Sequence, residues 1–345
     1  MDHARASRRL RRGAMSLGLA ALVAGAGFAL ARTQPGTPAS PQNRQPEPFE
    51  HSPEVRAAEK PRAFAPAIEV RLLELSTEAG PVRAFVALVD LKAPGVRVVT
   101  TAPLPSGSAP EKADSLLIPT DEWARATGAM LAVNANFFGR VDGKPVDDSG
   151  KAREPSDIMG LSIHDGVTVS PAREFKGVGD PALLILGDGS ARVGRWTAAK
   201  LPSARHAVAG IGASEAEPSR GGLLVSAGQN TGAGARVAWN RRHPRTAAGV
   251  SRDGRTLVLL VVDGRQPAWS VGMTLPELAE LAIEQGAWDA INLDGGGSSA
   301  FVYSDGVRSI SNRPSDGRFR PVANHLGIVR AQGSAGGAVK GSVPR

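Results

Sequence analysis

The segment from Thr256 to Phe301 decides the fold of this chain, and it reads TLVLLVVDGRQPAWSVGMTLPELAELAIEQGAWDAINLDGGGSSAF. Residues 256–262 form a continuous apolar run, typical of a buried strand, which ends at Asp263. Thr274 and Glu277 have the spacing of a capping box, and apolar residues then follow at helical intervals as far as Gly286. Residues 290–293 are the next apolar strand.

A strand, a helix and a second strand make a crossover unit. The pattern predicts that the two strands, within residues 256–293, run parallel and that the connection is right-handed. Asp263 and Asp294, which follow the two strands, are then expected at the same carboxyl edge of a sheet, where ligands of such sheets tend to bind.

The second strand leads directly into Asp294-Gly295-Gly296-Gly297-Ser298-Ser299. Three consecutive glycines lose much conformational entropy on folding, so a chain that keeps them between two apolar runs needs bare backbone there. Main-chain N–H groups beside a carboxylate and two hydroxyls suit an anionic or hydroxylated ligand. The alternative is a tight turn in which the glycines only supply positive φ angles.

Outside this segment, strands are predicted at residues 68–72, 82–88, 96–100 and 130–133 from alternating or β-branched patterns. Two hairpins are expected at 161–169 and 182–193, each turning at an Asp-Gly pair. Residues 121–128 have the pattern of a short helix capped by Thr120 or Asp121, and 139–157 that of a long polar loop. The fold class is therefore α+β, with mixed, twisted sheets and a few packed helices.

The two ends of the chain have a different composition. Residues 1–31 combine basic residues, a short apolar core and an Ala-Leu-Ala ending, which predicts a secretory signal or, alternatively, an uncleaved N-terminal anchor. Residues 32–66 are rich in proline and predict a linker, and 331–345 predict a disordered tail. One domain, residues 67–330, remains between them.

Charge and cysteine content exclude several classes of function. Residues 1–31 hold five arginines and Asp2, so without them the net charge falls from +8 to +4. No basic stripe interleaved with aromatic residues is visible, and nucleic acid is therefore not an expected partner. The chain has no cysteine, which excludes disulfides, thiol catalysis and cysteine metal sites.

Three further clusters could carry chemistry. Asn134 to Phe138 follows a buried strand and offers two side-chain amides and an apolar wall, or else a hydrogen-bonded turn. Arg245-Thr246 begins a strand of small residues, and a guanidinium there suits a bidentate grip on phosphate. Asp263-Gly264 is followed by Arg265. Together with Asp294, Asp263 would suit acid–base work or a divalent cation, so a metal role stays open.

Other well-known motifs are missing. The glycine stretch lacks the lysine and the following helix of a P-loop. There is no G-x-S-x-G elbow, and the six histidines show no H-x-x-x-H spacing of a zinc enzyme.

The clusters, in this order, resemble the phosphodiester glycosidase family over residues 125–330. The resemblance rests on Arg242-His243-Pro244-Arg245-Thr246-Ala247, Val262-Asp263-Gly264-Arg265, Asn292 to Ser299, and Asn312-Arg313-Pro314 with Arg320 and Asn324. The family's first motif is commonly Asn-Gly-Gly-Phe-Phe, whereas this chain has Asn136 in place of the second glycine.

This resemblance implies hydrolysis of a sugar 1-phosphodiester. The leaving group is a weakly basic phosphate monoester, so the reaction needs a cation or N–H donors for the phosphate and a carboxylate for the sugar carbon or for water. The predicted catalytic residues are Asp294, Asp263 and Arg245. The predicted substrate-binding residues are Asn134, Asn136, Phe137, Thr246, Gly295, Gly296, Gly297, Ser298, Ser299, Asn312 and Arg313.

The expected protein is an exported, periplasmic or extracellular hydrolase that acts on a carbohydrate or glycosyl-phosphate substrate of the cell envelope. It would contact a membrane only through an uncleaved N-terminal segment. The alternative is a non-catalytic protein that binds envelope polysaccharide with the same pocket.

Overall fold

The computed structural model describes residues 62–65, 67–110, 112–141, 151–212, 221–235, 238–306 and 309–330. The expected signal (1–31), nearly all of the linker and the tail (331–345) lie outside these ranges. The last residues of the expected linker, Arg62–Ala65, form a strand paired with Ile68–Val70, so the sheet begins earlier than the sequence indicates. Among the described residues, no helix has the length and apolar character needed to cross a membrane.

Strands dominate the described chain, and the helices are few, in agreement with the α+β class. The largest sheet has eight strands, in the order β1 (Arg62–Ala65), β2 (Ile68–Thr77), β3 (Gly80–Asp90), β19 (Thr256–Val262), β18 (Arg245–Val250), β20 (Asp289–Asn292), β16 (Val225–Ser226) and β17 (Gln229–Asn230).

A second sheet contains β11 (Val167–Ser170), β10 (Ser162–His164), β15 (Ala204–Ala209), β13 (Val178–Leu186), β12 (Glu174–Phe175) and β14 (Ala191–Trp196). A third is ordered β22 (Ser309–Ser311), β21 (Phe301–Ser304), β7 (Leu131–Asn134), β24 (His325–Arg330) and β4 (Val96–Thr100). Two small sheets pair β23 (Pro321–Val322) with β6 (Ile118–Pro119), and β5 (Ser115–Leu116) with β9 (Pro155–Ile158) and β8 (Phe138–Arg140).

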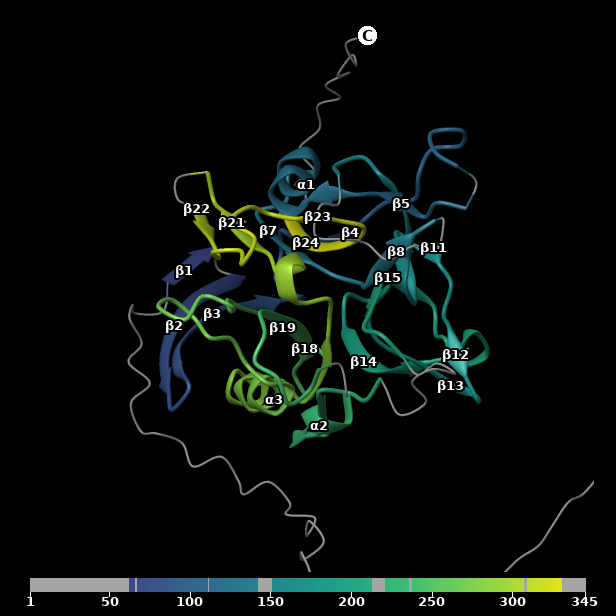
Figure 1. Cartoon of the computed structure of the whole chain (residues 1–345). Helices are drawn as coiled ribbons and strands as arrows, with labels where there is room; N and C mark the ends of the chain where they lie inside the picture. The colour runs from purple at the N-terminus through teal and green to yellow at the C-terminus, as the bar shows by residue number, and fades with distance from the viewer. Residues whose placement is uncertain are drawn as a thin grey trace, which may run out of the picture. The chain divides into compact units, whose positions relative to one another are not determined.

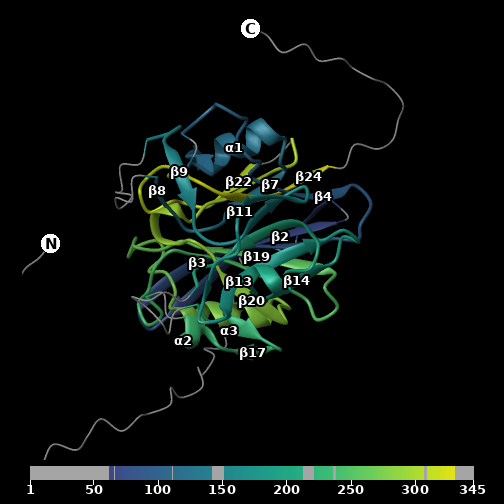
Figure 2. The ribbon, with the colours of Figure 1, turned by 90° about the vertical axis from the view of Figure 1, so that its right-hand side faces the viewer.

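The helices are α1 (Thr120–Thr127), α2 (Gly232–Ala235) and α3 (Leu275–Glu284), with two 3₁₀ turns, η1 (Ala198–Lys200) and η2 (Gly296–Ser298). Figure 1 shows α3 against the face of the large sheet formed by β18 and β19, and α1 beside the third sheet. The side view separates the same layers, with α1 at one end and α3 at the other (Figure 2).

The position of strand β19 between two cores explains its uninterrupted apolar sequence. Leu257, Leu259 and Val261 belong to the core between the large sheet and the other two sheets. Val258, Leu260 and Val262 alternate with them and face the second core, which includes α3. A strand that is buried on both faces carries apolar residues at every position.

The prediction of mixed sheets needs a correction, because every pairing between the described strands is antiparallel. Strand β18 lies between β19 and β20 and is antiparallel to both. The two strands joined by α3 therefore run in the same direction but do not pair. The handedness of their connection stays a prediction.

Four local predictions can be compared with the structure. Thr274 and Glu277 form the capping box at the start of α3, as the spacing predicts, and the Asp165-Gly166 turn joins β10 to β11. Helix α1 instead has Pro119 at its N-cap and no side-chain cap. The expected loop 139–157 is bounded by β8 and β9, which pair with each other.

Candidate active site

Asp294 lies two residues after the end of β20, at one edge of the large sheet. Register places Arg245 opposite Val262 and Ala247 opposite Asn292, so the start of β18 meets the carboxyl ends of β19 and β20 at this edge. The Asp294 N–H donates to the Ala135 carbonyl at 2.9 Å, and its own carbonyl accepts from the Asn134 side chain. These bonds fix the backbone of Asp294 on both sides.

The Asp294 carboxylate is half-buried, and its pKa lies above the usual value of an aspartate. Burial raises its pKa to about 6, opposed by hydrogen bonds from the Ser298 side chain and the Gly295 N–H and by the charge of Arg320. The Gly295 N–H lies 2.9 Å from the Oδ1 atom. Such a carboxylate is ionised in most molecules at neutral pH, yet it is destabilised enough to act as a base or nucleophile.

The glycines next to it allow close approach, and two of their N–H groups already have acceptors. The Gly295 N–H is bonded to Asp294, and the Gly296 N–H donates to the Pro244 carbonyl at 2.9 Å. Gly296 has φ +63°, and a Cβ there would lie 3.0 Å from the Arg265 guanidinium. A Cβ on Gly297 would lie 2.2 Å from Arg320 Nη2. The bare backbone therefore lets two arginines rest on this turn.

Arg265 and Arg320 were not among the predicted site residues. Arg265 is exposed and has φ +60°, a conformation that is uncommon for a residue with a side chain. Arg320 is held by Asp316, whose Oδ2 accepts from Nε at 2.9 Å and from Nη2 at 2.7 Å. Both arginines belong to the sequence motifs that carry the family resemblance. Only the tertiary structure shows that their guanidinium groups lie against the glycines.

Arg245, which is predicted to bind phosphate, has backbone partners in the structure. Its guanidinium is buried and donates to backbone carbonyls, from Nε to Met273 at 3.0 Å and from Nη2 to Ala238 and Arg241 at 2.7 and 2.8 Å. Burial lowers its pKa to about 10. Through these hydrogen bonds Arg245 holds the loop before β18 and the segment before α3 in place.

Asp263 also has a structural arrangement, although it lies at the predicted sheet edge. Its side chain is 1% exposed and accepts from Trp269 Nε1 at 2.8 Å, Asn312 Nδ2 at 2.9 Å and the Arg313 N–H at 3.1 Å. Burial raises its pKa despite these bonds. The carboxylate thus ties the loop after β19 to the loop after β22. The role of Asp263 as a second catalytic acid stays a prediction.

The three asparagines predicted to bind sugar hydroxyls are buried and occupied. Asn134 Oδ1 accepts from the Thr246 hydroxyl at 2.7 Å and from the Ala300 N–H at 3.0 Å. Asn312 joins Asp263 to the carbonyl of Ser299 and also accepts from the Phe301 N–H. Their amides fix the strands that present Asp294. The predicted contact with substrate stays a prediction.

Asn136, the departure from the family motif, makes four hydrogen bonds. Its amide group donates to the Met159 and Leu161 carbonyls, and its Oδ1 accepts from the Ala209 N–H and Asn324 Nδ2. A glycine could make none of these bonds. Asn136 therefore joins the second and third sheets.

Phe137, Ser299 and Arg313 complete the predicted set. Phe137 is half-buried, and Arg313 is exposed, with its guanidinium 5.4 Å from the Trp269 ring centre. The Ser299 hydroxyl is buried and has no hydrogen-bond partner among the described residues. No three His, Asp or Glu side chains of the described chain are grouped so as to hold a metal ion.

The model of the phosphodiester glycosidase family matches residues 127–329. This chain belongs to the phosphodiester glycosidase family. The match includes every residue placed around Asp294 and leaves the N-terminal strands β1 to β4 outside.

Individual relatives of this chain are distant. An uncharacterised SPbeta prophage-derived protein, YomE, of Bacillus subtilis (strain 168) is 33% identical over 183 residues. The N-acetylglucosamine-1-phosphodiester alpha-N-acetylglucosaminidase of Bos taurus is 46% identical over 72 residues. The aligned regions span 51% and 21% of this chain, and 26% and 12% of those proteins.

A solved structure shares the fold. The catalytic domain of the zebrafish N-acetylglucosamine-1-phosphodiester alpha-N-acetylglucosaminidase, auto-inhibited by its pro-peptide, superposes with a TM-score of 0.54 at 20% identity. The superposition covers 80% of this chain and 87% of that one. The architecture is therefore common to both, and function has to be argued from the site.

Proposed function

We propose that this phosphodiester glycosidase is an exported hydrolase that cleaves a glycosyl phosphodiester at the bond between the sugar carbon and the phosphate oxygen. The observation that carries the proposal is the half-buried Asp294, with Arg265 and Arg320 lying on the two glycines beside it. The N-terminal basic and apolar segment supports export, and a cell-envelope glycan is then the accessible substrate.

The chemistry divides between the carboxylate and the arginines. Arg265 and Arg320 neutralise the phosphate, which leaves as a weakly basic monoester without a strong general acid. The ionised Asp294 either attacks the sugar carbon or activates a water molecule. Asp316 keeps the Arg320 guanidinium in place while negative charge accumulates on the leaving group.

The proposal is tested by release of free sugar from a synthetic sugar 1-phosphodiester. We expect Asp294→Asn to lose turnover by about 10³-fold or more and to remain folded. Wild-type kcat/KM should fall as the pH drops below about 6, because protonation removes the attacking carboxylate.

Asp289→Asn is the matched control and should keep turnover, since Asp289 begins the strand that leads to Asp294 but accepts from the Ala227 N–H. Wild-type turnover in Asp294→Asn would exclude the proposed role. A parallel series with chelator tests whether a divalent cation takes part.

A non-catalytic polysaccharide-binding protein is the alternative. The buried asparagines near Asp294 are hydrogen-bonded within the protein and leave few polar groups for catalysis. This is the one observation that favours a binding protein. Binding of the synthetic diester by wild-type protein without any release of sugar would favour this alternative.

A further inference from the structure

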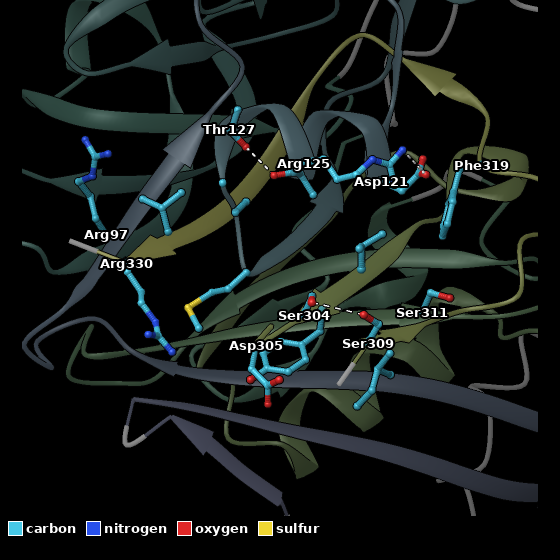
Figure 3. Close-up of a pocket in the computed structure, with 18 residues that line it drawn as sticks. Arg97, Asp121, Arg125, Thr127, Ser304, Asp305, Ser309, Ser311, Phe319 and Arg330 are labelled. Atoms are coloured by element: carbon cyan, nitrogen blue, oxygen red, sulfur yellow. Dashed lines mark hydrogen bonds and ion pairs between the residues drawn. The ribbon is translucent and has the colours of Figure 1, made fainter. Parts of the chain in front are cut away.

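A groove of about 870 Å³ lies between α1, the end of β24 and the hairpin of β21 and β22. Its floor is apolar and includes Met130, Val302, Ile310 and Phe319. Hydroxyl groups of Thr127, Ser304, Ser309 and Ser311 lie around it (Figure 3). An apolar floor with spaced hydroxyls matches a sugar ring, which has apolar C–H faces and polar edges.

Two arginines of the groove have no ion-pair partner among the described residues. Arg97 and Arg330 are exposed, and within the described ranges their side chains form no hydrogen bond or ion pair. Arg125 differs, because its Nη2 lies 2.9 Å from Asp121 Oδ2. Asp305 also lines the groove, which leaves three arginines against two aspartates and a net positive charge.

The groove is connected to the candidate active site by the chain itself. Phe319 lines the groove, while the next residue, Arg320, rests on Gly297 beside Asp294. Strand β21 makes a second connection, since it begins after the glycine turn and ends at Ser304 in the groove. A ligand longer than one sugar and its phosphate could therefore pass from one site over Phe319 to the other.

We propose that this groove binds an acidic saccharide segment, the part of the substrate polymer beyond the cleaved phosphodiester. The inference rests on the proposed function and names its substrate class, a glycan with repeated negative charges. Arg97 and Arg330 bind those charges, whether they are phosphates or carboxylates, and Phe319 packs against a sugar ring.

The tail that follows Arg330 is a less suitable occupant. Residues 331–345 contain Lys340 and Arg345 and no acidic residue. They would add positive charge to a groove that already holds unpaired arginines, and like charges repel. Charge complementarity therefore favours an anionic ligand from outside this segment.

The test measures binding by calorimetry with the full chain and two probes of equal length, hexagalacturonate for carboxylates and a glycerol phosphate hexamer for phosphates. We expect at least one probe to bind wild type, and about tenfold weaker binding by the double variant Arg97→Ser with Arg330→Ser. Arg192→Ser with Arg252→Ser removes the same charge from exposed positions outside the groove and should bind as wild type does. Neutral maltohexaose should bind none of them.

Three results would overturn the proposal: no binding of either probe, equal affinities in the two double variants, or binding only after removal of residues 331–345. Turnover of a synthetic sugar 1-phosphodiester with a methyl aglycone, too short to reach the groove, should be unchanged in Arg97→Ser with Arg330→Ser. If wild type does not cleave that compound, the proposed function fails, whereas the binding comparison still decides the groove.

Discussion

Two arginines of this chain show how the same side chain takes opposite roles. Arg245 directs its donors to three backbone carbonyls and is buried, whereas Arg320 is fixed by one aspartate beside a half-buried carboxylate. A phosphate bound through Nε or Nη2 of Arg245 would have to compete with those carbonyls. The functional arginines at this site are therefore expected to be Arg265 and Arg320.

This assignment predicts different outcomes for two substitutions. Arg245→Met should lower the free energy of unfolding by about 2–5 kcal/mol, because it leaves buried carbonyls without donors. Arg320→Met should leave stability nearly unchanged and raise KM or lower kcat for a sugar 1-phosphodiester. Urea unfolding and steady-state kinetics measure both effects, and the opposite pattern would return the phosphate-binding role to Arg245.

At the scale of elements, the turn from Asp294 to Ser299 is defined by what packs on it. Gly296 needs its positive φ, and Gly297 leaves room for the pair of Arg320 and Asp316. The sequence pattern located the turn and indicated its importance, but it favoured the glycines as donors. Hydrogen bonds to Asp294 and Pro244 already use two of those N–H groups.

Gly297→Ala tests this interpretation. The new Cβ would overlap with Arg320 Nη2 and with Asp316 Oδ2, at 2.2 and 2.4 Å, so the pair must move away from Asp294. We expect kcat/KM to fall about tenfold or more, because small displacements of positioning groups are costly in catalysis. Gly187→Ala is the matched control: no atom of the described residues lies within 4 Å of the position that its new Cβ would take, and activity should be kept. Equal activity of both variants would contradict the close-approach argument.

For the described domain as a whole, buried histidines make stability depend on pH. His325 stacks on Trp123 at 4.8 Å between ring centres and contacts Thr101 and Ile118, and burial lowers its pKa to about 3. The folded state thus holds this histidine neutral, while the unfolded chain takes up a proton below about pH 6.5. Its contribution to stability is complete above about pH 6.5 and is lost as the pH falls toward 3.

His325→Gln should remove this dependence. At pH 5, protonation of the unfolded wild-type chain costs about 2 kcal/mol of stability relative to pH 7.5, and the variant lacks that loss. The stability difference between wild type and variant should therefore shrink by about that amount at pH 5. Denaturant unfolding at the two pH values measures it, and a difference independent of pH would show that His325 is not held neutral.

The sequence alone determined the elements whose signals are local. A doubly buried strand needs apolar residues at every position, a capping box needs Thr274 and Glu277 three residues apart, and an Asp-Gly turn needs the left-handed conformations of those residues. The common edge of Asp263 and Asp294 also followed from the order of strand, helix and strand. These features depend on neighbours in the chain.

Only the tertiary structure decided which side chains remain free at that edge. Five of the predicted site residues are bonded to partners distant in the chain: Asn134, Asn136, Asn312, Asp263 and Arg245. The insertion of β18 between β19 and β20 was equally invisible, because strand order depends on long-range pairing. A buried polar residue has the same letter whether it binds a ligand or holds a scaffold, and only its hydrogen-bond partners separate the two.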